Sequence, residues 1–471
     1  MKHTFEYDPF QKQAMLEIDK GHSVIVSAPT GAGKTVIAEY VIDKCAQEKK
    51  GAIYTAPIKA LSNQKYRDFV SRYGDENVGI ITGDVSINPY APIVIMTTEI
   101  FRNALFYDDE KLLSRAWVIF DEIHYLDDIE RGTVWEESLM FFPGYMNMLC
   151  LSATIPNLGE LTSWMEQVHH FPIKQIIEKE RPVPLKHYFW CHKKIIKTLG
   201  DLDKYYHDIG AKTIQWKGVK EEIGTLINHI KENDHFPCIY FVFARRRCEE
   251  LAEDVSGYDF LTKQEKEQIT ELWDKLIDKY NLQEDRKARS IEFFIKRGIA
   301  YHHAGMLPTL KEVIEQLFAS KLIKLIFTTE TFALGINMPA RSVIFDELRK
   351  FYGFDFDVMR TRDYYQMAGR AGRRGMDVCG YVYSRVNCSR IPFRDIKKII
   401  TGEPEKVMSQ FNTSYATLMC LFNEFKEELF DVYLSSFHCH QAGKDSKHRA
   451  MRQLKEKISL SEAIDQINKN T

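Results

Sequence analysis

Ser27-Ala-Pro-Thr-Gly-Ala-Gly-Lys-Thr35 is the stretch that decides the fold. It follows a short apolar run and precedes a segment in which apolar side chains recur at helical spacing, so the expected order is strand, loop, helix. Gly31 and Gly33 let successive backbone N–H groups turn toward phosphate oxygens, and the helix adds its positive N-terminal end. Lys34 can then reach the terminal phosphates, and the Thr35 hydroxyl can ligate Mg²⁺. The stretch predicts a loop that binds a nucleoside triphosphate.

A pair of carboxylates supplies the second part of the same chemistry. Asp121-Glu-Ile-His124 follows the apolar run 117–120, which is typical of a buried strand whose carboxyl end meets ligands in an open α/β sheet. Beside a phosphate loop, Asp121 is expected to hold Mg²⁺ and Glu122 to orient and deprotonate the attacking water. Taken singly, the pair is also typical of a helix cap, and the glycine-rich stretch of an ordinary turn. Their order along the chain favours phosphate chemistry.

The third part is basic and lies in the second half of the chain. Gln366-Met-Ala-Gly-Arg-Ala-Gly-Arg373 and the next residue offer Arg370, Arg373 and Arg374, one of which could serve as an arginine finger that stabilises charge on the departing phosphate. Because these arginines are expected on a different lobe from Lys34, hydrolysis would depend on lobe closure. The alternative is a solvated basic turn.

Composition limits the class of protein. The chain has 471 residues, of which 44% are hydrophobic and 28% charged, as in an ordinary soluble globular protein. No apolar run approaches the roughly 20 residues of a membrane span, and the first residues lead into no secretory segment, so a cytoplasmic location is expected. The net charge of −2 argues against a uniformly basic surface. A nucleic acid would therefore need a local groove.

The nine cysteines show no C-x-x-C spacing and indicate reduced core thiols rather than a disulfide framework or a zinc site. His438-Cys439-His440 resembles a metal cluster but lacks partners at ligand spacing.

The order of apolar runs predicts an α/β protein with two tandem lobes, each a mostly parallel sheet with helices on both faces. The predicted divisions are a first lobe over 1–175, a crossing over 176–220 that contains Arg181-Pro-Val-Pro184, a second lobe over 221–400 and a short, mostly helical extension over 401–471. We expect no readable sequence repeat between the lobes, and a phosphate site in the cleft between them.

With these residues placed, the chain resembles the superfamily 2 DExH-box helicases, and within them the superkiller-type (Ski) group that includes the exosome-associated RNA helicases. The resemblance covers about residues 5–435 and implies two RecA-like lobes. It rests on motifs in family order, among them Asp8-Pro-Phe-Gln11, Thr55-Ala-Pro-Ile-Lys-Ala-Leu-Ser-Asn-Gln64, Met96-Thr-Thr-Glu99, Leu151-Ser-Ala-Thr154, Tyr301-His-His-Ala-Gly-Met306 and Thr328-Thr-Glu-Thr-Phe-Ala-Leu-Gly-Ile-Asn337.

The resemblance implies a nucleotide site that extends beyond the loop. Gln11 would recognise adenine, and Arg370 and Arg373 would be the favoured candidates for the arginine finger. The other residues implied to surround the nucleotide are Thr30, Gly31, Ala32, Gly33, Gly335 and Asn337. Residues implied to couple the nucleotide state to the grip on a strand are His124, Ser152, Thr154 and Gln366. Without the motif order, strand-end capping is the simpler interpretation of Ser152 and Thr154.

The resemblance also implies a face that binds a nucleic-acid backbone. Its residues are Pro57, Lys59, Thr98, Arg102 and Thr329, and their contacts with phosphates would be independent of sequence and sensitive to salt. Each of them is otherwise an ordinary surface residue.

An aromatic-rich segment looks like the strand-separating hairpin of the family. Lys350-Phe-Tyr-Gly-Phe-Asp-Phe-Asp357 would present Phe354 and Phe356 as a wedge, because stacking of a base on such a ring contributes about 1–3 kcal/mol. The alternative is a hairpin that packs against its own lobe.

The implied activity is ATP- and Mg²⁺-dependent movement along single-stranded RNA in the 3′-to-5′ direction. One alternative is a DNA helicase of the related repair group, because a contact with the 2′-OH is not legible in a sequence. The other is a clamp, or a nucleic-acid-stimulated ATPase that needs a protein partner to complete its channel, because residues 401–471 are too few for the additional domains of the family.

Overall fold

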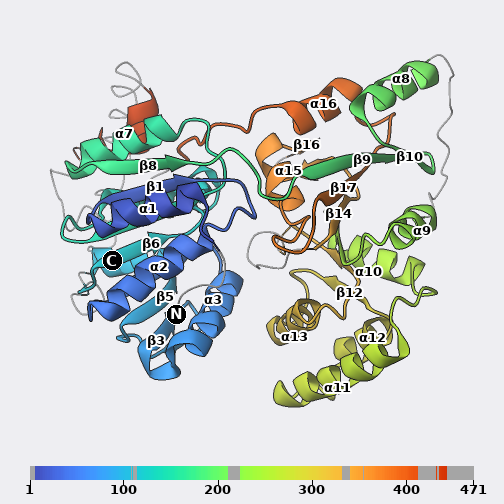
Figure 1. Ribbon diagram of the computed structural model, residues 1–471, viewed down its shortest axis with the longest axis horizontal. Helices are drawn as coiled ribbons and strands as arrows, with labels where there is room; N and C mark the ends of the chain where they lie inside the picture. Colours follow the sequence, from blue (N-terminus) through green and yellow to red (C-terminus); the bar gives the residue numbers. More distant parts are fainter. Residues whose placement is uncertain are drawn as a thin grey trace, which may run out of the picture. The chain divides into compact units, whose positions relative to one another are not determined.

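The computed structural model describes residues 6–107, 109, 114–210, 223–330, 332, 340–353, 355–411, 431 and 434–442. The chain divides into two compact units, which Figure 1 colours mainly blue to cyan and green to orange. The first comprises Met1–Ala28, Gly33–Glu180 and Glu405–Thr471, and the second comprises Pro29–Ala32 and Arg181–Pro404. Among the helices of the described ranges, none combines the length and the apolar character needed to cross a membrane.

The first unit is built on an eight-stranded sheet in the order β4-β3-β5-β2-β6-β7-β1-β8. Its strands are β1 (Ser23–Ser27), β2 (Ala52–Ala56), β3 (Val78–Ile81), β4 (Ser86–Ile87), β5 (Ile93–Thr97), β6 (Trp117–Phe120), β7 (Asn147–Ser152) and β8 (Ile173–Ile177). Every neighbouring pair is parallel except β3 with β4. The central strands are buried on both faces, which explains why they read as continuous apolar runs.

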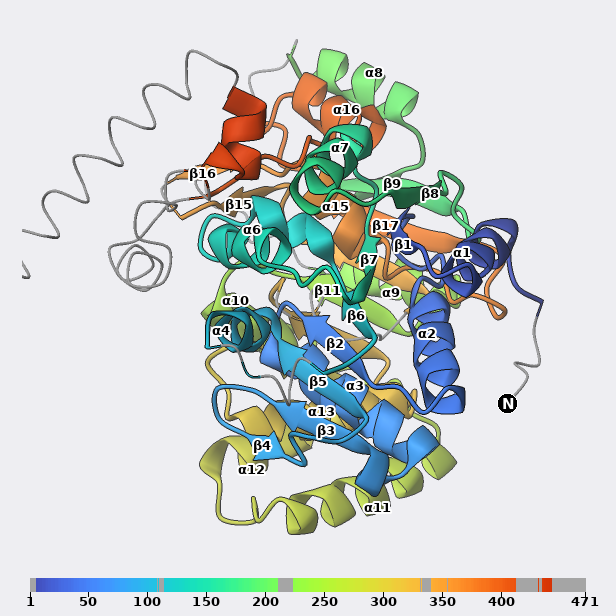
Figure 2. The same ribbon diagram turned by 90° about the vertical axis from the view of Figure 1, so that its left-hand side faces the viewer.

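Helices cover both faces of this sheet. They are α1 (Pro9–Asp19), α2 (Thr35–Gln47), α3 (Lys59–Tyr73), α4 (Thr98–Phe106), α6 (Gly132–Met140) and α7 (Leu158–His169), with short 3₁₀ turns η1 (Asp75–Asn77) and η2 (Ile123–Asp127). In Figure 2, α1 and α2 lie on one side of the sheet and α4 and α6 on the other.

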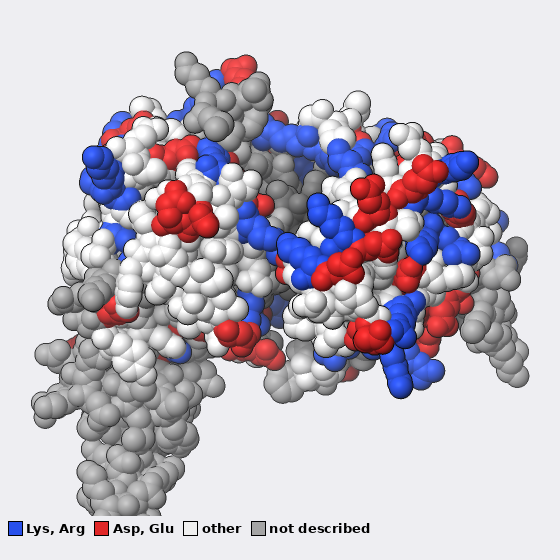
Figure 3. All heavy atoms as spheres, turned by 90° about the horizontal axis from the view of Figure 1, so that it is seen from below, with Lys and Arg blue, Asp and Glu red and all other residues white. Residues whose placement is uncertain are grey.

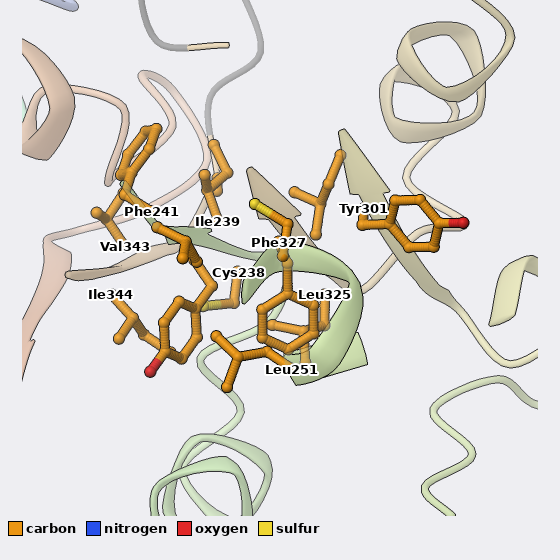
Figure 4. Close-up of a cluster of buried hydrophobic side chains, with 14 of the residues drawn as sticks. Cys238, Ile239, Phe241, Leu251, Tyr301, Leu325, Phe327, Val343 and Ile344 are labelled. Atoms are coloured by element: carbon orange, nitrogen blue, oxygen red, sulfur yellow. The ribbon is translucent and has the colours of Figure 1, made fainter. Parts of the chain in front are cut away.

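The second unit contains a seven-stranded sheet in the order β10-β9-β17-β14-β11-β13-β12, parallel except for β9 with β10. Its strands are β9 (Leu185–Cys191), β10 (Lys194–Ile196), β11 (Cys238–Phe241), β12 (Ile299–His302), β13 (Leu325–Thr328), β14 (Ser342–Phe345) and β17 (Gly380–Arg385). Figure 4 shows how Phe241, Phe327 and Ile344 gather around its central strands.

The helices of the second unit are α8 (Leu199–Gly210), α9 (Gly224–Glu232), α10 (Arg245–Asp254), α11 (Lys263–Lys279), α12 (Arg286–Ile295), α13 (Pro308–Ala319), α15 (Thr361–Ala368) and α16 (Phe393–Thr401). A separate antiparallel hairpin is formed by β15 (Arg349–Phe351) and β16 (Phe356–Val358). The prediction of an α/β protein with two mostly parallel sheets is confirmed.

The chain passes between the units at Glu180 and Arg181, within the wider crossing that we expected over 176–220. β9, β10 and α8 already belong to the second unit, because the chain after Pro184 joins its sheet beside β17. The expected extension over 401–471 starts without a helix at 403–411, and residues 437–442 are helical.

After the second unit the chain returns to the first. The side chain of Asn157 donates to Val407 O at 2.9 Å and accepts from Val407 N at 2.9 Å, as a neighbouring strand would. The buried carboxylate of Glu136 on α6 accepts from the Ser409 hydroxyl at 2.6 Å and from His438 N at 3.1 Å. These polar contacts hold the returning segment against α6 and α7.

The two units share one short stretch of sequence that we did not single out beforehand. Val118-Ile-Phe-Asp-Glu122 and Val343-Ile-Phe-Asp-Glu347 are identical, and they form β6 and β14 with the residues that follow them. A repeat of five residues is too short to be noticed without the strand register, which places both copies next to a strand that contains a tyrosine, Tyr54 or Tyr240.

Candidate active site

The loop between β1 and α2 has the backbone that the sequence predicts. Gly31 and Gly33 have φ angles of 86° and 89°, a region that L side chains rarely adopt, so both positions require glycine. The Lys34 ammonium donates to Ala28 O at 2.8 Å, and α2 begins at Thr35. The first-turn N–H groups of α2 and the lysine are therefore gathered at one end of the loop, as an anion site requires.

Gln11 lies against this loop and is fully buried. Its Nε2 donates to Gly33 O at 3.0 Å, and its Oε1 accepts from Asp8 N at 2.9 Å. The amide thus ties the start of α1 to the phosphate loop. One N–H and one lone pair of the amide are not used by these two bonds, which is what recognition of an adenine edge would need.

Asp121 is buried directly after β6. Its backbone N–H donates to Thr55 O at 3.1 Å, and its Oδ2 accepts a short hydrogen bond from the Tyr54 hydroxyl on the neighbouring β2. Burial raises the pKa of the Asp121 carboxyl, and the adjacent charge of Glu122 raises it further. A divalent cation here would offset both penalties.

Lys65 is a cation on the buried face of α3, and sequence reasoning missed it. It lies on the same stripe as Leu61 and Phe69, its ammonium is 5.8 Å from the centre of the Tyr54 ring, and its charge lowers the pKa of Asp121. The spacing in the sequence could have revealed it, because Lys65 lies four residues from each of two apolar residues and so falls on the buried face of the helix. A lysine is rarely buried without a partner, so such a position indicates a nearby carboxylate.

Glu122 has a strained backbone, with φ 60° and ψ 49°. A non-glycine residue in this left-handed region costs on the order of 1–3 kcal/mol, and such strain is concentrated at functional sites. The strain separates the directions of neighbouring side chains: Asp121 is buried, whereas the Glu122 side chain is about one-fifth exposed. Two consecutive carboxylates can thus serve different roles.

The predicted coupling residues of the first unit are brought together. His124 Nδ1 lies 3.4 Å from Glu122 Oε2 and 3.3 Å from Ser152 Oγ, and both the imidazole and the hydroxyl are buried. Ser152 ends β7, which lies between β6 and β1 in the sheet. Thr154 follows it, half-buried. A continuous polar path therefore runs from the proposed base to the adjacent strand end.

Five predicted residues of the second half of the chain bear on the same chemistry. Gly335 and Asn337 lie outside the described residues. Arg370 follows α15, which carries the half-buried Gln366. The Arg373 guanidinium holds Asp377 with two bonds, 2.7 Å from Nε to Oδ2 and 2.8 Å from Nη2 to Oδ1. To act as an arginine finger, Arg373 would have to break or share its ion pair with Asp377 when it contacts a phosphate.

Two of the residues predicted to contact nucleic acid point into their own unit. The Thr98 hydroxyl, on α4, is buried and donates to Ala56 O at 3.5 Å. Arg102 donates from Nη1 to Glu137 Oε2 at 2.6 Å, and its guanidinium lies over the ring of Phe106. Burial raises the pKa of Glu137, and Arg102 counters that shift. Arg102 thus neutralises a buried carboxylate, whatever else it contacts.

Lys59 is better placed for a backbone contact, whereas Pro57 is buried. Both lie where α3 and α4 follow the parallel neighbours β2 and β5. Their first turns present N–H groups at one edge of the sheet. Lys59 is half-exposed and forms an ion pair with Asp84 at 2.5 Å, and Pro57 O accepts from Arg131 Nη1 at 2.6 Å. Thr329, in the second unit, is half-buried after β13.

The hairpin β15–β16 has two different sides. Lys350 forms ion pairs with Glu330 at 2.7 Å and Asp363 at 3.0 Å, and Tyr352 donates to Asp363 at 2.8 Å, which fixes one side to its own unit. Phe356 is 53% exposed and Phe351 is 50% exposed, so the other side presents aromatic surface. Phe354 lies outside the described residues. The hairpin thus packs on its own unit along one side, and its role as a wedge stays a prediction.

Oxygen donors suit the metal that the sequence predicts. Across the described ranges, no three His, Cys, Asp or Glu side chains are grouped to hold a metal ion. Mg²⁺ bound with a nucleotide does not need such a group, because phosphates and water supply most of its ligands. The Thr35 hydroxyl and the buried Asp121 carboxylate are oxygen donors of the kind that Mg²⁺ accepts, and they are the ones that the sequence predicts.

No single basic coat covers the face that Figure 3 presents. Figure 3 shows Lys and Arg side chains interspersed with Asp and Glu on the face that it presents. This agrees with the net charge of −2. Any polyanion would be bound locally by backbone N–H groups and a few cations.

Comparison with known proteins relates both units to the same kind of protein. Residues 8–161 match the DEAD/DEAH box helicase family, and residues 221–375 match the helicase conserved C-terminal domain. The tandem RecA-like architecture predicted from the motifs is confirmed by these two domains together with the two α/β sheets.

Similar proteins extend the match over nearly the whole chain. Exosome RNA helicase MTR4 of Homo sapiens is 40% identical over 498 residues, which cover 99% of this chain and 46% of that protein. Superkiller complex protein 2 of Homo sapiens is 37% identical over 497 residues, 98% of this chain and 40% of that protein. ATP-dependent RNA helicase mtr4 of Schizosaccharomyces pombe is 38% identical over 451 residues, 89% of this chain and 40% of that protein. The chain spans less than half the length of these relatives.

Proposed function

The chain belongs to the DExH-box helicases, and on this premise we propose that it is an ATP-dependent helicase or translocase that moves along single-stranded RNA in the 3′-to-5′ direction. The observation that carries the proposal is the polar path from Glu122 through His124 to Ser152, beside the buried Asp121. The preference for RNA draws support from the relatives that are named RNA helicases, and the direction of movement from the resemblance to the superkiller-type group.

Each polar group of the first unit has a defined task in this proposal. The N–H groups at the start of α2 and the Lys34 ammonium bind the triphosphate, and Gln11 reads the adenine edge. Thr35 and Asp121 hold Mg²⁺, which when bound neutralises charge on the β- and γ-phosphates. Glu122 orients the attacking water and accepts its proton. Arg370 and Arg373 are the proposed arginine fingers from the second unit.

His124 is the proposed link between hydrolysis and movement. It touches both the base and Ser152, so proton uptake by Glu122 changes the hydrogen bond that reaches the end of β7. Thr154 and Gln366 complete the coupling set of the proposal. The starts of α3 and α4, with Pro57, Lys59, Thr98 and Arg102, and Thr329 in the second unit, grip the strand through its phosphates.

Separation of strands and any protein partner are further parts of the proposal, because the chain spans less than half of its relatives. The exposed aromatic side of the β15–β16 hairpin, with Phe356 and its neighbour Phe354 in sequence, is the proposed wedge. A partner that completes the channel would make unwinding processive. A cytoplasmic location suits a chain whose described cysteines are thiols.

The test is ATP turnover by the purified chain with no polymer, with single-stranded RNA and with single-stranded DNA of equal length at equal salt. We expect RNA to stimulate turnover at least tenfold and DNA to stimulate it much less. Equal stimulation by DNA would show that the motor does not discriminate between RNA and DNA. No stimulation by either polymer would reject the proposed motor in this chain. Duplexes with either a 3′ or a 5′ overhang then test direction, and displacement only from the 5′ overhang would overturn the proposed polarity.

A further inference from the structure

Two thiols on neighbouring strands of the second unit lie close to bonding distance. Cys191 ends β9, and Cys388 follows β17, which pairs with β9 in parallel. Their sulfur atoms are 3.1 Å apart. Because a disulfide bond is about 2.05 Å long, the sulfurs need to approach by only about 1 Å.

The strand pairing brings the two residues to the same end of the sheet. Val386 N donates to Trp190 O at 2.9 Å, which fixes the pairing one residue before Cys191 and two residues before Cys388. The two cysteines are therefore not direct partners in the register, and the evidence for their closeness is the 3.1 Å between the sulfur atoms. Closing the bond requires an approach of about 1 Å between these sulfurs.

We propose that Cys191 and Cys388 form a reversible disulfide when the protein meets hydrogen peroxide, which makes this pair a redox modification site outside the nucleotide chemistry. Cys388 is half-buried and Cys191 is buried, so Cys388 is the thiol that reacts first with the oxidant. This arrangement of an accessible thiol beside a second, inner thiol is typical of redox-sensing cysteines.

The reaction balances with one molecule of peroxide. The Cys388 sulfur attacks one peroxide oxygen, the O–O bond breaks, and a sulfenic acid and one water are formed. The Cys191 sulfur then attacks the sulfenic sulfur, and the hydroxyl group leaves with the Cys191 proton as a second water. Two thiols lose two electrons and two protons, and peroxide is reduced to two waters.

The surroundings of this pair differ from those of the other buried cysteines. His192 Nδ1 is 3.5 Å from Cys191 Sγ and 2.6 Å from the Tyr205 hydroxyl, so polar groups adjoin the sulfur. Cys238 lies within β11 and Cys45 within α2, and burial raises the pKa of each of these thiols to about 12. Thiols of that kind are inert toward peroxide, because the thiolate is the nucleophile.

The cross-link would stabilise the second unit. The segment after β17 leads into α16, and the Tyr206 hydroxyl on α8 also donates to Ile391 O at 2.8 Å in this segment. A bond from Cys191 to Cys388 closes a loop that contains most of the second unit, and long closed loops lose the most unfolded-state entropy. We expect the melting temperature of the oxidised chain to rise by about 5 °C or more.

The experiment treats the full chain with increasing hydrogen peroxide, blocks remaining thiols under denaturing conditions and identifies linked peptides by mass spectrometry. The expected result is an intramolecular link between the Cys191 and Cys388 peptides, with loss of two hydrogens, that dithiothreitol reverses. The thiols of Cys45 and Cys238 in the same sample are internal controls, and they should be recovered unoxidised and carrying only the blocking group.

Variants separate the site from a general effect of oxidation. Cys388→Ser should abolish the link and the rise in melting temperature, and Cys45→Ser should leave both unchanged. The wild-type peptide map does not depend on either variant, so it tests the proposal even if Cys388→Ser folds poorly. Sulfinic acid on Cys388 without a link, a bond between two chains on a non-reducing gel, or no reaction at Cys388 would each overturn the proposal.

Discussion

The two units contain the same tyrosine–aspartate pair in the same strand register. In the first unit Tyr54 on β2 donates to Asp121 after β6, and in the second unit Tyr240 on β11 donates to Asp346 after β14 at 2.8 Å. Asp121 N donates to Thr55 O, and Asp346 N donates to the equivalent Phe241 O. The repeated Val-Ile-Phe-Asp-Glu sequence therefore forms the same strand end, with the same tyrosine–aspartate hydrogen bond, in both units.

The difference lies in the cation that faces the carboxylate. Asp346 is neutralised by protein groups, since Arg385 Nη1 is 2.8 Å from Oδ1 and Arg247 Nε is 3.7 Å from Oδ2. Asp121 has the charge of Lys65 nearby and the repelling charge of Glu122 beside it. Guanidinium groups neutralise the aspartate of the second unit, whereas the aspartate of the first unit is the one that we propose binds a cation.

The largest difference between the units should be seen in the glutamates that end the repeat. We expect Glu122→Gln to lower ATP turnover by about 10³-fold while binding of an ATP analogue changes less than threefold, because it removes the proposed base without altering the phosphate loop. Glu347→Gln is the matched control: this residue is exposed, forms an ion pair with Arg390 at 3.4 Å, and should leave turnover within twofold of wild type. Steady-state kinetics and analogue titration measure both quantities. Unchanged turnover in Glu122→Gln would assign the base elsewhere.

The aspartates should separate function from stability. Asp346→Asn removes the charged acceptor of Arg385 and one of three carboxylates near Arg247, so we expect a loss of about 1–3 kcal/mol and a lower melting temperature. Asp121→Asn should abolish Mg²⁺-dependent turnover yet keep or raise the melting temperature, because it removes a buried charge next to Glu122. Thermal melts and turnover of both variants test this. Equal destabilisation by the two changes would mean that both carboxylates are structural.

Glu136 shows what a buried carboxylate does without an arginine. Burial raises its pKa from 4.5 to about 7, although hydrogen bonds from Ser409 and the N–H groups of His438 and Phe437 oppose the shift. The folded chain therefore binds this proton more tightly than the unfolded chain, and the stabilisation is complete below about pH 4.5 and lost as the pH rises through 7.

Glu136→Gln should remove that pH dependence. The amide can accept from His438 N and donate to Ser409, as the protonated acid does, so we expect the variant to match wild type at pH 5 and to exceed it at pH 8 by on the order of 2 kcal/mol. Thermal melts of both proteins at several pH values give the difference. Parallel curves from pH 5 to pH 8 would show that Glu136 keeps its ordinary pKa.

Local sequence patterns predicted what depends on neighbours in the chain. The phosphate loop, the strand before Asp121 and the helices of the second unit follow from apolar spacing and from glycine at positive φ, which are properties of short segments. The two-unit α/β architecture follows from the alternation of such segments.

Contacts between distant segments could not be predicted in this way. Two such contacts, Asn157 with Val407 and Glu136 with Ser409, join residues that are more than 200 positions apart. A local sequence pattern cannot predict contacts over that separation. The ion pair between Arg102 and Glu137 was missed for the same reason, and it changes the interpretation of Arg102 from an exposed contact to a residue that first serves its own unit.

The smallest difference between the units concerns the tyrosine hydroxyls. Burial raises the pKa of both Tyr54 and Tyr240 well above the usual value, so each remains a hydrogen-bond donor to its aspartate. Tyr54→Phe leaves Asp121 less well oriented, and we expect the Mg²⁺ concentration for half-maximal turnover to rise about 3–10-fold, in line with the net contribution of about 0.5–1.5 kcal/mol from one hydrogen bond. Tyr240→Phe should lower the melting temperature and leave the Mg²⁺ dependence unchanged, since Arg385 still holds Asp346.

Both phenylalanine variants lose a buried hydrogen bond, so a lower melting temperature alone cannot separate a positioning role from a structural one. The deciding readout is calorimetric binding of Mn²⁺ in the presence of ADP, which reports the metal site without turnover. A weaker affinity in Tyr54→Phe with normal affinity in Tyr240→Phe would show that the shared pair is used for metal binding in the first unit alone. Equal affinities in the two variants would show that the Tyr54–Asp121 hydrogen bond has only a structural role, as the Tyr240–Asp346 hydrogen bond has.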